Sequence, residues 1–256
     1  MILKLRAALF SLGYAVLTLV ISIVVMAVFW LLPVRHRSYF YSLWCRLVIH
    51  WLRITCGVRY RIHGAEHIPQ RPVVIVSNHQ STWETIFLYQ LFDPVCPILK
   101  KELLDIPFWG WALRLQRPIA IDRSKPREAG KSLLTQGAAR IKDGLSVLVF
   151  PEGTRAPPQG IRKYSRGGAQ LAAVTQTDIV PVLHNAGNFW PAGTTLKKPG
   201  VIDVIIGPPI GAFGKTSKEL AAECDAWVEE NRERVGLVPM APADNTAVAA
   251  PVTGKS

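Results

Sequence analysis

A histidine and a carboxylate stand five residues apart, directly after a short apolar stretch. Residues 73–76 are β-branched and apolar, Ser77 ends the stretch, and the sequence Asn-His-Gln-Ser-Thr-Trp-Glu follows at 78–84. Proteins with alternating strands and helices keep reactive side chains in the loops that follow strands. An imidazole titrates near neutrality, and a carboxylate bonded to one ring nitrogen fixes its tautomer. The pattern therefore predicts proton transfer, with His79 as the general base and Glu84 as the acid that orients it.

Both residues also have an ordinary structural interpretation. Ser81 and Glu84 have the spacing of a capping box, in which the acid returns a hydrogen bond to the start of a helix. A histidine at a strand end is often only a hydrogen-bonded structural residue. Residues five apart on a straight helix point about 140° apart, so His79 has to precede the helix for Glu84 to reach it. From these residues alone, both interpretations stay open.

A second polar group follows another apolar stretch, at 146–150. The sequence Phe-Pro-Glu-Gly-Thr-Arg at 150–155 offers a glycine backbone, a hydroxyl and a guanidinium, which together can hold a phosphate. A further arginine follows the apolar residues 119–121. Each arginine taken alone could be a solvated surface charge. Because the carboxyl ends of parallel strands share one edge of a sheet, we expect a phosphate site near His79. Its predicted members are Arg123, Glu152, Gly153, Thr154 and Arg155.

Short apolar runs alternate with helical patterns from residue 71 onward, which predicts an α/β domain with a largely parallel sheet flanked by helices. The expected strands are 73–77, 119–121, 146–150, 179–183 and 201–206. The expected helices are 82–91, 101–116, 127–142, 167–175 and 217–234. We divide the chain into membrane-associated helices at 1–58, a catalytic domain at 59–236 and a disordered tail, rich in Ala and Pro, at 237–256.

The beginning of the chain favours lipid over water. Residues 7–32 carry no charge, and such a helix exceeds the roughly 30 Å of a hydrocarbon core. The run also exceeds the apolar part of a signal peptide, so we expect it to be retained. Residues 39–58 are aromatic and apolar, with Arg46 and Arg53 on one face, which predicts an amphipathic interfacial helix; a buried helix of the domain is the alternative. More arginines follow the apolar run than precede it, which favours a cytoplasmic domain.

The net charge of +12 implies an anionic partner, which by charge alone could be nucleic acid, lipid headgroups or a phosphorylated substrate. The four cysteines are scattered and form no CxxC pair, so the sequence suggests neither a zinc site nor a disulfide framework. Reduced thiols fit this pattern best. The chain also has no G-x-S-x-G turn, which argues against a serine nucleophile and favours a reaction without a covalent intermediate on the protein.

Several motifs in order resemble the 1-acylglycerol-3-phosphate acyltransferase family over about residues 60–234. They are Asn-His-x4-acid, Asp-Arg at 122–123, Phe-Pro-Glu-Gly-Thr-Arg at 150–155 and Ile-Val-Pro-Val at 179–182. Segments 100–103 and 106–110 are also similar to that family. The resemblance implies the glycerolipid-acyltransferase fold and acyl transfer from acyl-CoA or acyl-carrier protein to the sn-2 hydroxyl of lysophosphatidic acid. The product would be phosphatidic acid, made for phospholipid biosynthesis.

On this interpretation the partners are lysophosphatidic acid, the acyl donor and membrane lipids. No nucleic acid, metal or organic cofactor is expected, and the protein should lie on the cytoplasmic side of the inner membrane. The sequence departs from the family pattern in three places: the usual Asp is Glu84, the expected Gly is replaced near Arg117, and an expected Lys is Ser165. Alternatives are acylation of another lysolipid, such as lyso-ornithine lipid or a lysophospholipid, or a non-catalytic lipid-binding role.

Overall fold

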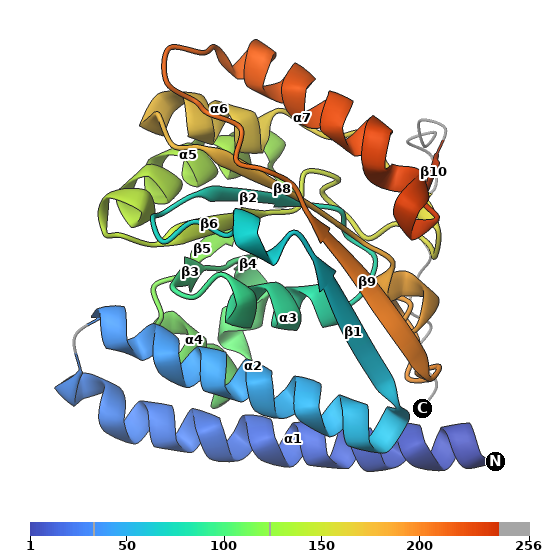
Figure 1. Ribbon diagram of the computed structural model, residues 1–256. Coiled ribbons are helices and arrows are strands. Elements are labelled where there is room, and N and C mark those ends of the chain that lie inside the picture. Colours follow the sequence, from blue (N-terminus) through green and yellow to red (C-terminus); the bar gives the residue numbers. More distant parts are fainter. Residues whose placement is uncertain (33, 123, 241–256) are drawn as a thin grey trace.

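A six-stranded sheet in the order β1-β9-β8-β2-β6-β3 forms the centre of the molecule. The structure is a computed structural model that describes residues 1–32, 34–122 and 124–240 (Figure 1). Within the sheet, neighbouring strands are parallel except β8 and β9. The strands are β1 (Val58–His63), β2 (Val74–Ser77), β3 (Val95–Cys96), β6 (Ser146–Val149), β8 (Ile179–His184) and β9 (Gly200–Ile206).

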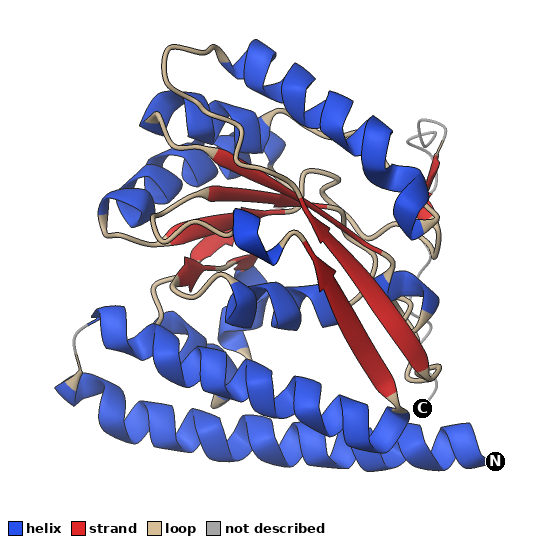
Figure 2. Cartoon of the chain, in the orientation of Figure 1, coloured by secondary structure: helices blue, strands red, loops and turns tan. Residues whose placement is uncertain are grey.

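Helices cover both faces of this sheet (Figure 2). On one face lies α3 (Trp83–Leu91), which packs against α2 (Val34–Cys56), and α1 (Ile2–Val28) lies beyond α2 (Figure 1). On the other face lie α5 (Pro126–Lys142), α6 (Gly167–Thr175) and α7 (Ser217–Asn231). The predicted α/β fold with a largely parallel, helix-flanked sheet is confirmed.

Strand β2 runs between β8 and β6 and is buried along its whole length. Its side chains alternate between the two faces, as the pleat of a strand requires. Ile75 packs into the core on the α3 side, whereas Val74 and Val76 pack into the core below α5 and α6. Both cores therefore fix the position at which β2 ends, and the loop that carries His79 begins there.

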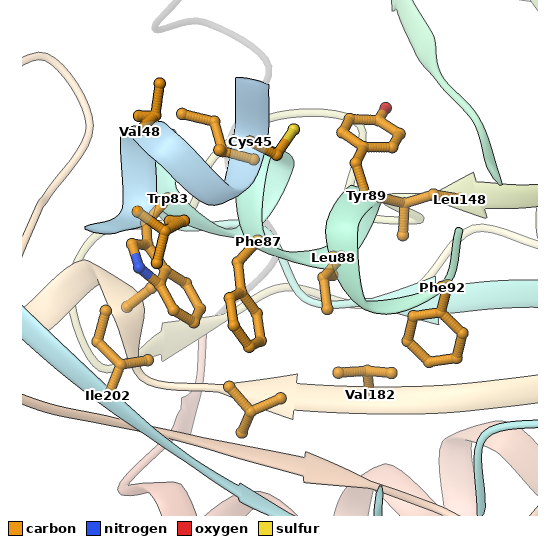
Figure 3. Packing of buried hydrophobic residues seen from close by; sticks show 14 of the residues in the cluster. Cys45, Val48, Trp83, Phe87, Leu88, Tyr89, Phe92, Leu148, Val182 and Ile202 are labelled. Atoms are coloured by element: carbon orange, nitrogen blue, oxygen red, sulfur yellow. The ribbon is translucent and has the colours of Figure 1, made fainter. Parts of the chain in front are cut away.

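The apolar face of α2 is part of the domain core. Trp44, Cys45, Val48 and Leu52 are each at most 4% exposed and belong to the same buried cluster as α3 and the sheet. Figure 3 shows Cys45 and Val48 facing α3, with Trp83 and Phe87 between α2 and the strands. The sequence left open whether this segment is an interfacial helix or a buried one, and the described side chains show that this face is buried.

Helix α1 is long and apolar enough to cross a membrane, judged by length and composition. Its outer face exposes large apolar side chains, including Leu5, Leu12 and Val16, whereas Phe10 is buried against the domain. The two N-terminal helices approach closely at Gly13, where a Cβ would come within 2.1 Å of the Trp51 indole nitrogen. One face of α1 therefore belongs to the protein interior, and the other is free to meet lipid.

Some expected elements differ in the structure. The helix expected at 101–116 is divided into a 3₁₀ turn, Lys101–Asp105, and α4 (Trp109–Arg114). The expectation of one helix is wrong because Pro107 lacks an N–H and Phe108 adopts a φ of 61°. The strand at 119–121 exists as β5 (Ile119–Ile121), but it pairs with β4 (Ile98–Lys100) in a separate small sheet.

The chain after α7 is hydrogen-bonded to the domain as far as residue 240. Leu237 is 1% exposed, and β10 (Val238–Pro239) pairs in parallel with β7 (Gly160–Ile161). The tail that we expect to be disordered therefore has a packed beginning, where it rests against the segment that follows the Phe-Pro-Glu-Gly-Thr-Arg sequence. The rest of that expectation, residues 241–256, lies outside the described residues.

Candidate functional site

His79 lies in the loop that joins β2 to α3 and is 4% exposed. Its Nδ1 is 2.8 Å from Glu84 Oε1, and its ring stacks on Phe150 with 4.2 Å between the ring centres. Because a carboxylate can only accept, Nδ1 donates to Glu84, which leaves Nε2 as the nitrogen for a substrate. His79 lines a cavity of about 710 Å³. The imidazole is thus oriented on one side by an acid and opens on the other side to a ligand-sized space.

Glu84 is fully buried, and three hydrogen bonds from the loop converge on its Oε1. This oxygen accepts hydrogen bonds from His79 Nδ1 and from the backbone N–H groups of Gln80 and Ser81, at 2.7–2.8 Å. Burial raises the pKa of Glu84, but His184 and the hydrogen bonds from His79 and Ser81 outweigh it and hold the pKa below its ordinary value. The two interpretations of Glu84 are not exclusive, since one oxygen returns a bond to the start of the helix and also meets the histidine.

The helix begins at Trp83, so His79 precedes it, as the spacing of the pair requires. At this start, the Ser81 hydroxyl accepts the backbone N–H of Trp83 at 3.0 Å. The arrangement places a fully buried carboxylate beside an imidazole that is 4% exposed.

Asn78 and His184 lock this loop to the end of β8. The Asn78 amide donates to the His184 carbonyl and accepts the His184 N–H, at 2.9 and 3.0 Å. The His184 ring donates in turn to the Asn78 carbonyl at 2.9 Å. Burial lowers the pKa of His184, although Glu84 opposes the shift. The pair brings together residues 106 positions apart, and nothing local in the sequence points to it.

Glu152 is turned toward the backbone rather than toward the cavity. Its Oε1 accepts the N–H of His79 at 2.7 Å, and its Oε2 accepts the N–H of Arg162 at 2.9 Å. Burial raises the pKa of Glu152 to about 7, against the two backbone N–H groups, which lower it. We expected Glu152 among the phosphate contacts. Both of its oxygens are occupied by backbone donors, and a carboxylate would repel a phosphate.

Cationic and hydroxyl groups lie beside His79 on the same cavity. Arg155 and Thr154 line it, and Arg155 Nε donates to the Ser81 carbonyl at 3.0 Å, which leaves its outer nitrogens for a ligand. Lys100, at the end of β4, lines it as well. The sequence singled out residues 100–103 only as a segment of family likeness and missed this lysine as a site residue. Gly153 lies in the same loop with a φ of 71°, and Arg123 lies outside the described residues.

The lining of the cavity is both polar and aromatic. Aromatic side chains from α1, α2 and α3 belong to its walls, among them Tyr14, Trp44 and Tyr89. Leu99 and Trp109 add to this apolar part. A space lined by both cations and aromatic side chains suits an amphiphile with an anionic head and a hydrocarbon chain.

Comparison with known proteins agrees with this geometry. A family model described as Acyltransferase matches residues 59–185. The chain is 46% identical over 212 residues to a 1-acyl-sn-glycerol-3-phosphate acyltransferase of Pseudomonas aeruginosa, covering 81% of this chain and 82% of that protein. It is 31% identical over 183 residues to the human 1-acyl-sn-glycerol-3-phosphate acyltransferase alpha, covering 70% of this chain and 65% of that protein.

A solved structure has the same fold. The crystal structure of the 1-acyl-sn-glycerophosphate (LPA) acyltransferase from Thermotoga maritima superposes with a TM-score of 0.76 at 23% identity. The match covers 90% of this chain and 95% of that one.

Proposed function

Because this chain belongs to the 1-acyl-sn-glycerol-3-phosphate acyltransferase family and is an acyltransferase, we propose that it acylates the sn-2 hydroxyl of 1-acylglycerol 3-phosphate. The product is phosphatidic acid, and the donor is acyl-CoA or acyl-carrier protein. The observation that carries this proposal is the His79–Glu84 pair, which opens on a cavity that Lys100 and Arg155 also line.

In this reaction His79 Nε2 takes the proton from the acceptor hydroxyl as its oxygen attacks the thioester carbonyl. The new ester C–O bond forms, the C–S bond breaks, and the imidazolium returns its proton to the departing thiolate. Glu84 stabilises the positive ring between these steps and holds the tautomer that leaves Nε2 free. Direct transfer of this kind needs no nucleophile from the protein.

The acceptor phosphate is held by Arg155, Thr154 and Lys100, with the Gly153 backbone and Arg123 as further members. These contacts convert binding energy into orientation of the hydroxyl at His79. We assign Glu152 to a different task than the sequence indicated. Through its bond to the His79 N–H, it positions the loop that carries the base.

We place the protein at the inner membrane, with the sheet on the cytoplasmic side. The exposed apolar face of α1 supports membrane association, and the arginines that follow α1 support the orientation. The acyl chains of donor and acceptor would then lie in the aromatic part of the cavity, whose walls come partly from α1 and α2.

The test measures free thiol released from acyl-CoA, and separately from acyl-carrier protein, by detergent-solubilised protein, with and without lysophosphatidic acid. The proposal expects thiol release only with the acceptor, and its loss in His79→Ala. Parallel reactions with lyso-ornithine lipid and other lysophospholipids distinguish the alternative acceptors. A protein that binds lysophosphatidic acid but releases no thiol with either donor would be a lipid-binding protein instead.

A further inference from the structure

A second hollow lies between α6 and α7, on the face of the sheet opposite the cavity of His79. Its volume is about 250 Å³, and Val76, Ala169 and Ile179 form its apolar base. The polar part of its wall is mainly cationic, with three basic side chains against one carboxylate. These residues are Lys163, Arg166, Lys218 and Asp225.

The beginning of α6 adds a second source of positive potential. Arg166 is its N-cap residue, no side chain caps this end, and no acid lies in its first turn. Gly168 and Ala169, from that first turn, belong to the wall of the hollow. Unpaired N–H groups at a helix start favour a bound anion, above all a phosphate.

Tyr164 also belongs to the wall, and it is partly buried. Its hydroxyl has no hydrogen-bond partner among the described residues, but it is buried and does not open onto the hollow. The features that favour an anion here are therefore the helix start and the three cations of the wall.

The hollow is also tied to the loop that holds His79. The Ser165 N–H donates to the Pro151 carbonyl at 3.0 Å, and Pro151 lines the hollow. The next residue, Glu152, accepts the N–H groups of Arg162 and His79. An anion bound beside residues 163–166 would therefore stabilise the segment against which Glu152 rests.

We propose that this hollow is a phosphoryl-binding site separate from the site for the acceptor phosphate. Its volume admits a phosphate with a small adjoining group, and it is smaller than the roughly 300–1,000 Å³ that a whole drug-sized ligand occupies. The ligand is thus the phosphate-bearing end of a larger molecule or a free phosphate. The one carboxylate, Asp225, opposes binding but is outnumbered by the three cations.

The experiment is a calorimetric titration of the full-length protein in uncharged detergent, with free CoA, glycerol 3-phosphate and inorganic phosphate as separate probes. All titrations use an Arg155→Ala background, which removes a main contact of the acceptor site. Ala222 lies on the exposed surface of α7 and lines the hollow. Ala222→Glu introduces a carboxylate there, and Ala222→Gln is its uncharged control.

We expect Ala222→Glu to weaken binding by about ten-fold or more, because a carboxylate close to a bound phosphate repels it, and Ala222→Gln to leave binding within about two-fold. An effect seen with CoA alone identifies the donor as the source. An effect with glycerol 3-phosphate but not inorganic phosphate identifies a lipid headgroup, and an equal effect with all three identifies a simple phosphate site. Equal binding of every probe to the Glu and Gln variants would overturn the proposal.

A second pair of variants tests the cations themselves. The combined change of Lys163, Arg166 and Lys218 to Ala should weaken binding on the order of ten-fold, since each exposed cation contributes modestly. Lys215→Ala is the control, because Lys215 lies near the start of the same helix but pairs with Glu223 and does not line the hollow. Equal loss in both proteins would mean that general charge, rather than this hollow, attracts the anions. These titrations need no acyl transfer, so their outcome is independent of the proposed reaction.

Discussion

Replacing Glu84 by Gln removes one negative charge and leaves the local geometry in place. The N–H groups of Gln80 and Ser81 both point at the position of Oε1. The amide oxygen must occupy that position, because the NH₂ group would face two donors there. His79 Nδ1 consequently keeps an acceptor, and the tautomer is preserved. The amide nitrogen takes the place of Oε2, which has no hydrogen-bond partner among the described residues.

The loss of activity in Glu84→Gln then measures how much the negative charge of Glu84 stabilises the transition state. Two unit charges about 4 Å apart attract by roughly 4 kcal/mol at an effective dielectric constant near 20. The amide dipole retains part of this, so about 2–4 kcal/mol of transition-state stabilisation is lost, or roughly 30- to 1,000-fold in kcat. This is less than the roughly 10⁴-fold loss of a serine-hydrolase triad whose Asp becomes Asn, because that change also inverts the tautomer. The free energy of unfolding should change by less than about 2 kcal/mol, since the buried charge is removed together with its stronger hydrogen bonds.

The assay is thiol release from acyl-CoA at saturating lysophosphatidic acid, with thermal melting as the control for folding. Glu84→Asp withdraws the carboxylate by one methylene from its three donors and should keep partial activity. His79→Ala should lose at least as much as Glu84→Gln, and the double variant little more, since the two act as one unit. Full activity in Glu84→Gln with unchanged melting would refute this reasoning and leave Glu84 as a helix cap only.

In that event Glu152 would be the next acid to test. It contacts the backbone of His79 directly. Asp122, from the Asp-Arg pair at 122–123, is another acid beside a predicted site residue. In the structure its carboxylate accepts bonds from the backbone and hydroxyl of Ser124 and lines a separate groove. Asp122 is therefore unsuited to orient the histidine.

Arg155→Ala and Lys100→Ala should each raise the KM for lysophosphatidic acid by roughly 10- to 150-fold, which is the usual effect of losing a charge-assisted hydrogen bond. The KM for the acyl donor should change much less. A larger change in the donor KM than in the acceptor KM would mean that the acceptor phosphate binds elsewhere. Because the pKa of Glu152 is raised to about 7 in the folded protein, the folded state binds its proton more tightly than the unfolded state. The stabilisation that protonated Glu152 gives the folded protein is therefore lost as the pH rises from about 4.5 to 7. Melting temperatures across this range should fall less steeply in Glu152→Gln than in the parent, and parallel curves would argue against the shift. Removal of residues 1–57 should give aggregated rather than soluble protein, because α2 buries several side chains worth about 1.5–3 kcal/mol each in the core. A monomeric product with a sharp melting transition would contradict this.

The parts of the fold that the sequence predicted are those with strong local signals. β-branched runs placed β2, β6, β8 and β9 within one or two residues of their observed ends. The acid and the histidine were also within reach of local reasoning, because only five residues separate them. The family resemblance, carried by motifs after several strands, supplied what the pattern of strands alone did not.

The missed contacts depend on residues far apart in the chain. The bonds of Asn78 to His184 and of Glu152 to His79 span 106 and 73 residues, and no periodicity marks them. Lys100 reaches the cavity because β4 and β5 leave the main sheet and pair with each other, whereas the sequence suggested that all the strands share one edge. The local sequence pattern therefore located His79 and Glu84 but not the residues that position them.

The sequence left open whether lipid or protein covers α2 for a related reason, and the answer bears on how the protein uses its N-terminal helices. An amphipathic pattern says that a helix has an apolar face, but not whether lipid or protein covers it. Here protein covers it, and the same helix provides Tyr41 and Trp44 to the wall of the cavity that His79 lines, beside Tyr14 from α1. The cavity is therefore complete only when both helices are docked on the sheet. Because α1 also exposes apolar side chains on its outer face, contact with lipid and the shape of this cavity depend on one structural unit.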